Sequence, residues 1–170
     1  WLVIGAAGLL RPGSVAYVGR VLFPLGALTG VALAIVAGAS LAMPAEQATL
    51  LIGLPDLPFH ARLDPLSRVF LVLLGAASAG VSIFAAGYFR KGQGTAPGVL
   101  GLQYHLFLAS MGFVLLADDA YAFMVAWETM ALSSYFLVTA QHGIPEIRSA
   151  GFLYLLIAHL GAISILLCFV

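Results

Sequence analysis

Long apolar runs separated by short polar segments make up most of the chain. A helix needs about 20 residues to cross roughly 30 Å of hydrocarbon. Five runs are long enough, and a sixth at the start is too short to cross alone. The predicted spans are a truncated helix at 1–10 and full spans at 21–43, 66–89, 99–117, 120–141 and 149–170.

The polar segments between these runs contain the prolines, loop glycines and most of the charges. We expect loops at 11–20, 44–64, 90–98, 118–119 and 142–148. Within the longest loop, residues 48–54 and 59–63 have the composition of a short hairpin at the membrane face. Asp64 and Pro65 suit the start of the following helix. An Asp side chain can accept a hydrogen bond from the free N–H groups of the first helical turn. Proline is tolerated in that turn, because the N–H that it lacks would have no partner within the helix.

Small residues recur every fourth position along the 21–43 run, at Gly26, Gly30, Ala34 and Gly38. Small residues at this spacing let membrane helices approach closely. The stripe therefore predicts helix packing and requires no chemistry.

The composition agrees with a membrane location. Hydrophobic residues make up 62% of the chain and charged residues 8%, whereas soluble domains carry about 25% charged residues. We predict an all-α fold, a polytopic transmembrane helical bundle. The formal net charge is zero, which argues against a nucleic-acid partner. The single cysteine, Cys168, cannot form an internal disulfide.

Both ends of the sequence lie inside apolar runs, at Trp1 and Val170. The start lacks the basic segment of a signal peptide. We therefore expect residues 1–170 to be one transmembrane domain that is a fragment of a longer bundle.

Basic residues fall on alternate loops. Arg11 and Arg20, then Arg90 and Lys91, then Arg148 are expected on the cytoplasmic side, because positive loops stay inside. The 120–141 helix then runs from outside to inside, starting from a solvated turn at residues 118–119.

Glu128 is the strongest candidate for chemistry. It lies nine residues beyond Asp119, so about 13 Å into the 120–141 helix. An ionised residue near the midplane costs about 3 kcal/mol on insertion scales, and intramembrane acids usually mark ion or proton pathways. The alternative is a protonated carboxyl that only bonds a neighbouring helix. Little on its own helix face can hold a charge, so we expect a partner from another helix.

His159 is the second candidate. It lies about 15 Å from the cytoplasmic end of its helix, so Glu128 and His159 should reach similar depths on antiparallel neighbours. Histidine titrates near neutral pH and suits a proton relay. A neutral histidine bonded between packed helices is the equally weighted alternative.

His105 is the third candidate for the proton pathway. It lies closer to the cytoplasmic side, where it either lines a water-filled access path or, as the favoured interpretation, serves packing. No histidine pair has metal-ligand spacing, and no phosphate-binding loop or nucleophile constellation is present. We therefore predict no metal, no cofactor and no catalytic residue.

Several stretches resemble the antiporter-like, proton-conducting membrane subunits of respiratory complex I, Mrp-type sodium/proton antiporters and energy-converting hydrogenases. The resemblance is greatest to the group of hydrogenase-4 component B and formate hydrogenlyase subunit 3. The stretches are RLDPLS (62–67), FLASM (107–111), LLADDAYAFMVAWETMALSSYFLV (115–138) and RSAGFLYLLIAHLGA (148–162).

The resemblance implies that this chain is the amino-terminal part of such a subunit. The mid-membrane glutamate of that family, in a Trp-Glu context, corresponds to Glu128, and its lysine partner would lie beyond Val170. Complex I relatives tend to carry a basic residue where this chain has His159. The implied partners are lipid, other membrane subunits, peripheral redox subunits and protons, or else Na⁺, in a prokaryotic cytoplasmic membrane.

Three functions follow as alternatives. The first is a non-catalytic, proton-translocating subunit of a redox-driven oxidoreductase complex of the hydrogenase or NADH dehydrogenase type. The second is a cation/proton antiporter subunit of the Mrp type. The third is a structural membrane anchor without an ion path.

Overall fold

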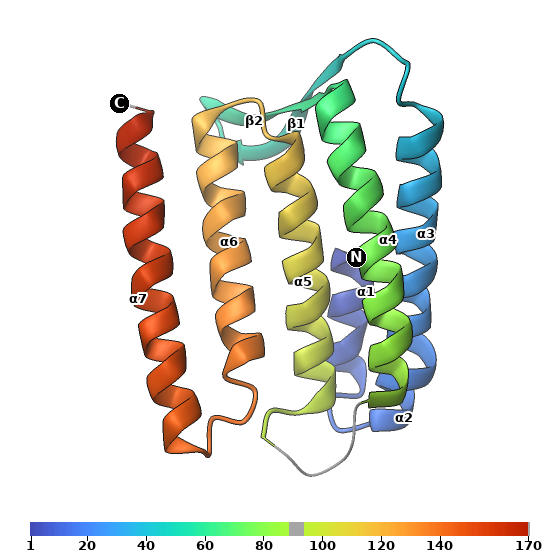
Figure 1. Cartoon of the computed structure of the whole chain (residues 1–170), viewed down its shortest axis with the longest axis vertical. Helices are drawn as coiled ribbons and strands as arrows, with labels where there is room; N and C mark the ends of the chain where they lie inside the picture. Colours follow the sequence, from blue (N-terminus) through green and yellow to red (C-terminus); the bar gives the residue numbers. More distant parts are fainter. Residues whose placement is uncertain (89–93, 170) are drawn as a thin grey trace.

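The computed structural model describes residues 1–88 and 94–169, which form helices and one two-stranded hairpin (Figure 1). The elements are α1 (Leu2–Ala7), the 3₁₀ helix η1 (Gly8–Leu10), α2 (Val15–Tyr17), the π-helical turn η2 (Val18–Leu22), α3 (Phe23–Ala39), β1 (Glu46–Leu54), β2 (Leu57–Leu63), α4 (Pro65–Tyr88), α5 (Pro97–Leu116), α6 (Ala120–Val138) and α7 (Pro145–Cys168).

Four helices of the described chain are long and apolar enough to cross a membrane: Val15–Ala39, Pro65–Tyr88, Pro97–Leu116 and Pro145–Cys168. The chain is an all-α, polytopic membrane helical bundle. Helix α6 is 19 residues long and falls outside this set, with Glu128 lowering its mean hydropathy. It nevertheless lies alongside α5 and α7 (Figure 1), and its crossing of the bilayer stays a prediction.

The helix expected at 21–43 begins and ends earlier in the structure. It starts at Val15, where the Oγ of Ser14 accepts a hydrogen bond from the backbone N–H of Tyr17 at 3.2 Å. It ends at Ala39. Most of the loop expected at 11–20 is therefore helical. The Ser14 side chain caps the helix at this point, so the helix begins before the apolar run does.

The other helices begin or end within a few residues of the predicted limits. Three of them start at a proline in the first turn, at Pro65, Pro97 and Pro145, as expected where the proline N–H is not needed. Phe89, Arg90, Lys91 and Val170 lie outside the described residues, so the two basic residues expected on the cytoplasmic side there stay a prediction.

Helices α3 and α4 pack with their backbones in close approach. A Cβ on Gly30 would lie 2.5 Å from the Oγ of Ser78 and 2.7 Å from the carbonyl oxygen of Gly75. A Cβ on Gly75 would in turn lie 2.7 Å from the backbone nitrogen of Ala34. The packing role of the small-residue stripe is confirmed here, although Gly38 has no neighbour closer than 3.8 Å.

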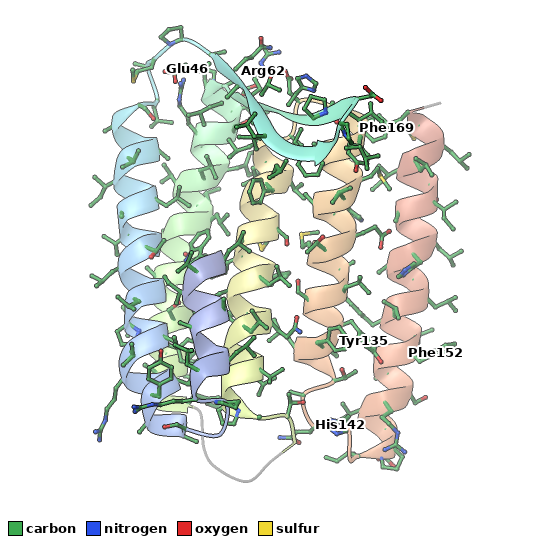
Figure 2. The ribbon with its side chains drawn as sticks, turned by 180° about the vertical axis from the view of Figure 1, so that it is seen from behind. Glu46, Arg62, Tyr135, His142, Phe152 and Phe169 are labelled. Carbon is green, nitrogen blue, oxygen red and sulfur yellow. The ribbon has the colours of Figure 1, made fainter. Side chains whose placement is uncertain are left out.

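The predicted hairpin is confirmed, with longer strands than expected. β1 and β2 are antiparallel, paired from Glu46 with Leu63 to Leu54 with Leu57. The hairpin lies over the ends of α5 and α6, where the N–H of Asp118 donates to the carbonyl of His60 at 2.9 Å. Figure 2 shows Glu46 and Arg62 at this end of the bundle and His142 at the opposite end.

The buried core lies among the amino-terminal helices. One cluster contains Val18, Leu22, Phe23 and Ala85, and the other contains Ala37, Leu71, Leu74 and Leu108. Helix α7 packs along α6 and is the least covered of the spanning helices, with Phe152 pointing outward (Figure 2). The carboxyl-terminal side therefore presents an apolar surface to lipid or protein.

Candidate functional site

Helix α6 carries Glu128, and its first turn fixes where the helix begins. Asp119 is the N-cap, and its Oδ1 accepts a hydrogen bond from the N–H of Ala122 at 2.6 Å. Such caps are worth about 1 kcal/mol. Glu128 therefore occupies the third turn of a helix whose start is held by a side chain.

Helix α7 carries His159 and runs antiparallel to α6. The hydroxyls of Ser134 and Tyr154 form a hydrogen bond of 2.5 Å between the two helices. Nearer the hairpin end, the rings of Phe123 and Phe169 meet edge to face with centroids 5.8 Å apart. Contacts on both sides thus set the register that brings Glu128 opposite His159.

The Nε2 of His159 lies 3.6 Å from the Oε2 of Glu128. The depth estimate for these residues agrees with this contact, and Glu128 meets a side chain from another helix, as expected. The described residues leave 33% of the Glu128 side chain and 46% of the His159 side chain uncovered. The pair lies at the helix interface with one side open.

The hydrogen bond on the other ring nitrogen determines what this pair can do. The Nδ1 of His159 lies 2.9 Å from the carbonyl oxygen of Leu155. A carbonyl only accepts, so Nδ1 carries a proton and Nε2 is the atom that gains or loses one. One proton can therefore reside on the Glu128 carboxyl or on Nε2. At 3.6 Å a small movement is needed, since a strong hydrogen bond of this type measures about 2.8 Å.

His105 does not join this pair. It is fully buried in α5 and packs against Phe23 and Tyr104, with ring centroids 6.2 and 5.2 Å away. Its Nδ1 donates to the carbonyl of Gly101 at 2.8 Å, and its Nε2 is buried in the same core. The described residues show it in the packed core, and its place in a proton pathway stays a prediction.

The polar side chains that surround His105 were not predicted from the sequence. The hydroxyls of Ser82 and Tyr104 lie 2.9 Å apart, and Tyr104 also donates to the carbonyl of Ser78 at 3.3 Å. Both serines are buried. Their spacing of four residues along α4 was the available signal, because it places them on one helix face.

Arg68 was also missed. It has no exposed surface, and it donates to the carbonyls of Met43 and Pro44 at 2.5 and 2.9 Å. One guanidinium nitrogen lies 4.0 Å from Glu46. The signal was a charged residue within the apolar run that follows Asp64. The guanidinium joins α4 to the chain that leaves α3.

The Asp118–Asp119 turn is more than a solvated turn, which corrects the expectation from sequence. Asp118 accepts from the amide of Gln47 at 3.1 Å and lies 3.9 Å from Arg62. Asp119 accepts from the backbone N–H of His60 at 2.8 Å. His60 falls within the loop expected at 44–64, and its contact with Asp119, 59 positions further along the chain, has no local signal in the sequence.

The pKa of the Asp119 carboxyl is lowered in the folded chain. Partial burial acts to raise it, but hydrogen bonds from the N–H groups of Ala122 and His60 and from the His60 imidazole outweigh burial. Asp119 is therefore an anion that links the hairpin to α6.

Comparison with known proteins finds relatives over part of the chain, and no family model matches. The uncharacterised protein Rv0083 of Mycobacterium tuberculosis is 39% identical over 114 residues, which cover 66% of this chain and 17% of that protein. Hydrogenase-4 component B of Escherichia coli K12 is 35% identical over 108 residues, which cover 64% of this chain and 16% of that protein. The chain thus spans about one sixth of the length of these relatives.

Proposed function

We propose that this chain is part of a proton-translocating membrane subunit of a redox-driven complex of the hydrogenase type. The observation that carries the proposal is the contact between Glu128 and His159 on two apolar, antiparallel helices. Placing a carboxyl and an imidazole at this depth in the bilayer costs free energy. Such groups therefore usually line an ion path or bond to each other.

The chemistry of the pair favours protons over sodium. A hard cation requires several oxygen ligands, whereas this site offers one carboxylate facing one imidazole nitrogen. The imidazole Nε2, unlike a sodium ligand set, offers one position that can hold a proton. His105 remains a candidate for the proton pathway in this proposal. It is a buried, titratable group in the neighbouring core and does not contact Glu128 or His159.

Similarity to hydrogenase-4 component B supports placement in a hydrogenase-like complex over a stand-alone antiporter. The whole complex, its electron donor and its peripheral redox subunits belong to this proposal. A cation/proton antiporter subunit is the second candidate, because the same pair could exchange a proton in that setting. A purely structural anchor would leave Glu128 without a use beyond bonding His159.

Transport by the full-length protein in its complex tests the proposal. Glu128→Gln keeps the size of the side chain and its hydrogen bonding but cannot carry the proton. In inverted membrane vesicles driven by the redox reaction, this variant should assemble at the parental level and lose proton uptake. Glu146→Gln, in the exposed first turn of α7, is the matched control and should transport normally. Parental proton uptake by Glu128→Gln would overturn the proposal.

The driving reaction separates the two transport functions. A subunit of a redox complex should move protons only when the electron donor is supplied. Proton movement that follows an imposed sodium gradient, without any electron donor, would instead identify an antiporter subunit.

A further inference from the structure

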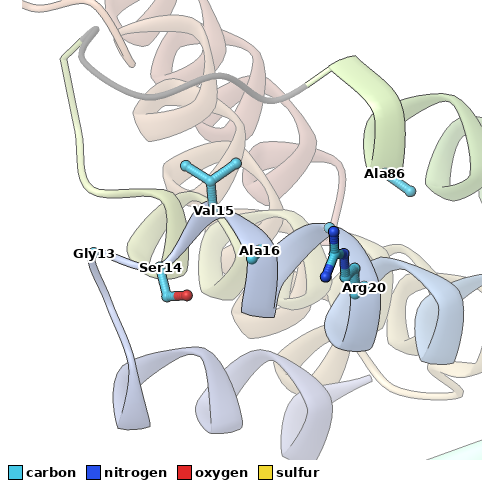
Figure 3. Close-up of a pocket in the computed structure, with 7 residues that line it drawn as sticks. Gly13, Ser14, Val15, Ala16, Arg20 and Ala86 are labelled. Carbon is cyan, nitrogen blue, oxygen red and sulfur yellow. The ribbon is translucent and has the colours of Figure 1, made fainter.

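A groove opens at the end of the bundle opposite the hairpin, between the start of the Val15–Ala39 helix and the last turns of α4 (Figure 3). Its volume is about 670 Å³. The lining residues are Gly13, Ser14, Val15, Ala16, Gly19, Arg20 and Ala86. Small side chains leave this space open between the two helices.

The floor of the groove is a close helix contact. A Cβ on Gly19 would lie 2.9 Å from the carbonyl oxygen of Ala86. At Gly13 no other atom lies within 4 Å of such a position. The two helices therefore meet at Gly19 and leave room towards Gly13, at the level where the membrane-spanning helix begins.

The groove carries positive charge. Arg20 lines it and is exposed, and no described carboxylate lies within ion-pairing distance of its guanidinium. Arg11 lies close by along the chain, with its guanidinium 5.9 Å from the ring centroid of Tyr17. None of the seven lining residues is acidic.

The π-helical turn places Arg20 on this side. Within Val18–Leu22, the side chains of Val18 and Leu22 are fully buried, while Gly19 and Arg20 line the groove. Extra residues in a π-helical turn shift side chains around the helix and are frequent at functional sites. The turn thus buries the apolar positions and leaves the guanidinium at the groove.

We propose that this groove binds the phosphate headgroup of an anionic phospholipid. Arg20 would hold the phosphate oxygens, and the Ser14 hydroxyl can still donate, since its oxygen only accepts from Tyr17. The acyl chains would run along the exposed apolar side chains of the Val15–Ala39 helix, among them Leu25 and Leu28. Basic pockets between membrane helices bind such headgroups, and this proposal is independent of proton transport.

Lipid retention by the full-length protein tests the site. The protein is purified from vesicles with equal amounts of phosphatidylglycerol and phosphatidylcholine, and the retained lipid is identified by native mass spectrometry. Phosphatidylglycerol should be enriched. Arg20→Gln should reduce that enrichment about fivefold, since a basic residue at the surface contributes about 1 kcal/mol. Ala16→Phe keeps the charge but fills the groove, and should reduce it as well.

Arg148→Gln is the matched control, because Arg148 lies at the same end of the bundle on α7 and outside the groove. It should retain phosphatidylglycerol like the parent. An equal loss in Arg148→Gln and Arg20→Gln would show a general charge effect and overturn the site. Arg20-dependent binding of inorganic phosphate without lipid enrichment would also overturn the lipid assignment. Should Ala16→Phe fail to fold, the comparison of the two arginine variants still decides.

Discussion

The carboxylate of Asp119 accepts hydrogen bonds from His60 twice, from the backbone N–H at 2.8 Å and from the imidazole Nδ1 at 3.2 Å. Its other oxygen caps α6 through the N–H of Ala122. One side chain therefore fixes both the hairpin and the start of the helix that carries Glu128. The position of the hairpin and the position of the candidate site are physically linked.

Asp119→Ala should lower the stability of the full-length protein by about 1–2 kcal/mol, because the helix loses its cap and the hairpin loses its anchor. Thermal unfolding in detergent measures this. Asp56→Ala, in the exposed turn of the hairpin, is the control and should change little. Equal unfolding temperatures for Asp119→Ala and the parent would show that the cap contributes nothing.

The same contact predicts a pH dependence. The pKa of Asp119 is lower in the folded chain than its ordinary value of 3.8. Its contribution to stability is therefore fully present above the ordinary value and is lost as the pH falls through the folded pKa. The stability difference between the parent and Asp119→Ala should be constant at higher pH and shrink in acid. A difference that grows on acidification would contradict the assignment.

Arg68 should stabilise the connection between α4 and the chain that leaves α3. Arg68→Met removes both donors to the carbonyls of Met43 and Pro44, and leaving these acceptors unpaired should cost about 2–4 kcal/mol. Thermal unfolding of the full-length protein measures the loss. Arg62→Met provides the control, since that side chain is half exposed and its ion pair with Asp118 measures 3.9 Å. Similar losses in both variants would remove the special role of Arg68.

Gly26 and His105 should be coupled. A Cβ on Gly26 would lie 2.6 Å from the Nε2 of His105 and 3.2 Å from the Oγ of Ser82, so Gly26→Ala should force the buried imidazole to move. Gly38→Ala meets nothing closer than 3.8 Å and should be neutral or up to about 1 kcal/mol stabilising. Adding His105→Ala to Gly26→Ala should recover part of the loss, which unfolding of the single and double variants measures.

The sequence was sufficient for features with a period or a length, and insufficient for those set by tertiary contact. Span lengths predicted the bundle, and the positions of Glu128 and His159 along two antiparallel helices predicted that they would lie at similar depth. The role of Arg68 could not be predicted from the sequence, because its hydrogen-bond acceptors are backbone carbonyls, which every residue possesses. The bonds of Asp119 to His60 depend on where the hairpin folds back, and the early start at Val15 depends on one serine side chain.

The final prediction concerns whether Glu128 and His159 act as one unit. If one proton passes between them, His159→Gln removes the same step as Glu128→Gln, because Gln cannot take up the proton at that position. The double variant should then transport no worse than the more impaired single variant, as residues that act together are strongly non-additive. Proton uptake by the assembled complex in vesicles measures all three. Normal transport by His159→Gln in an assembled complex would reduce His159 to a packing residue beside Glu128.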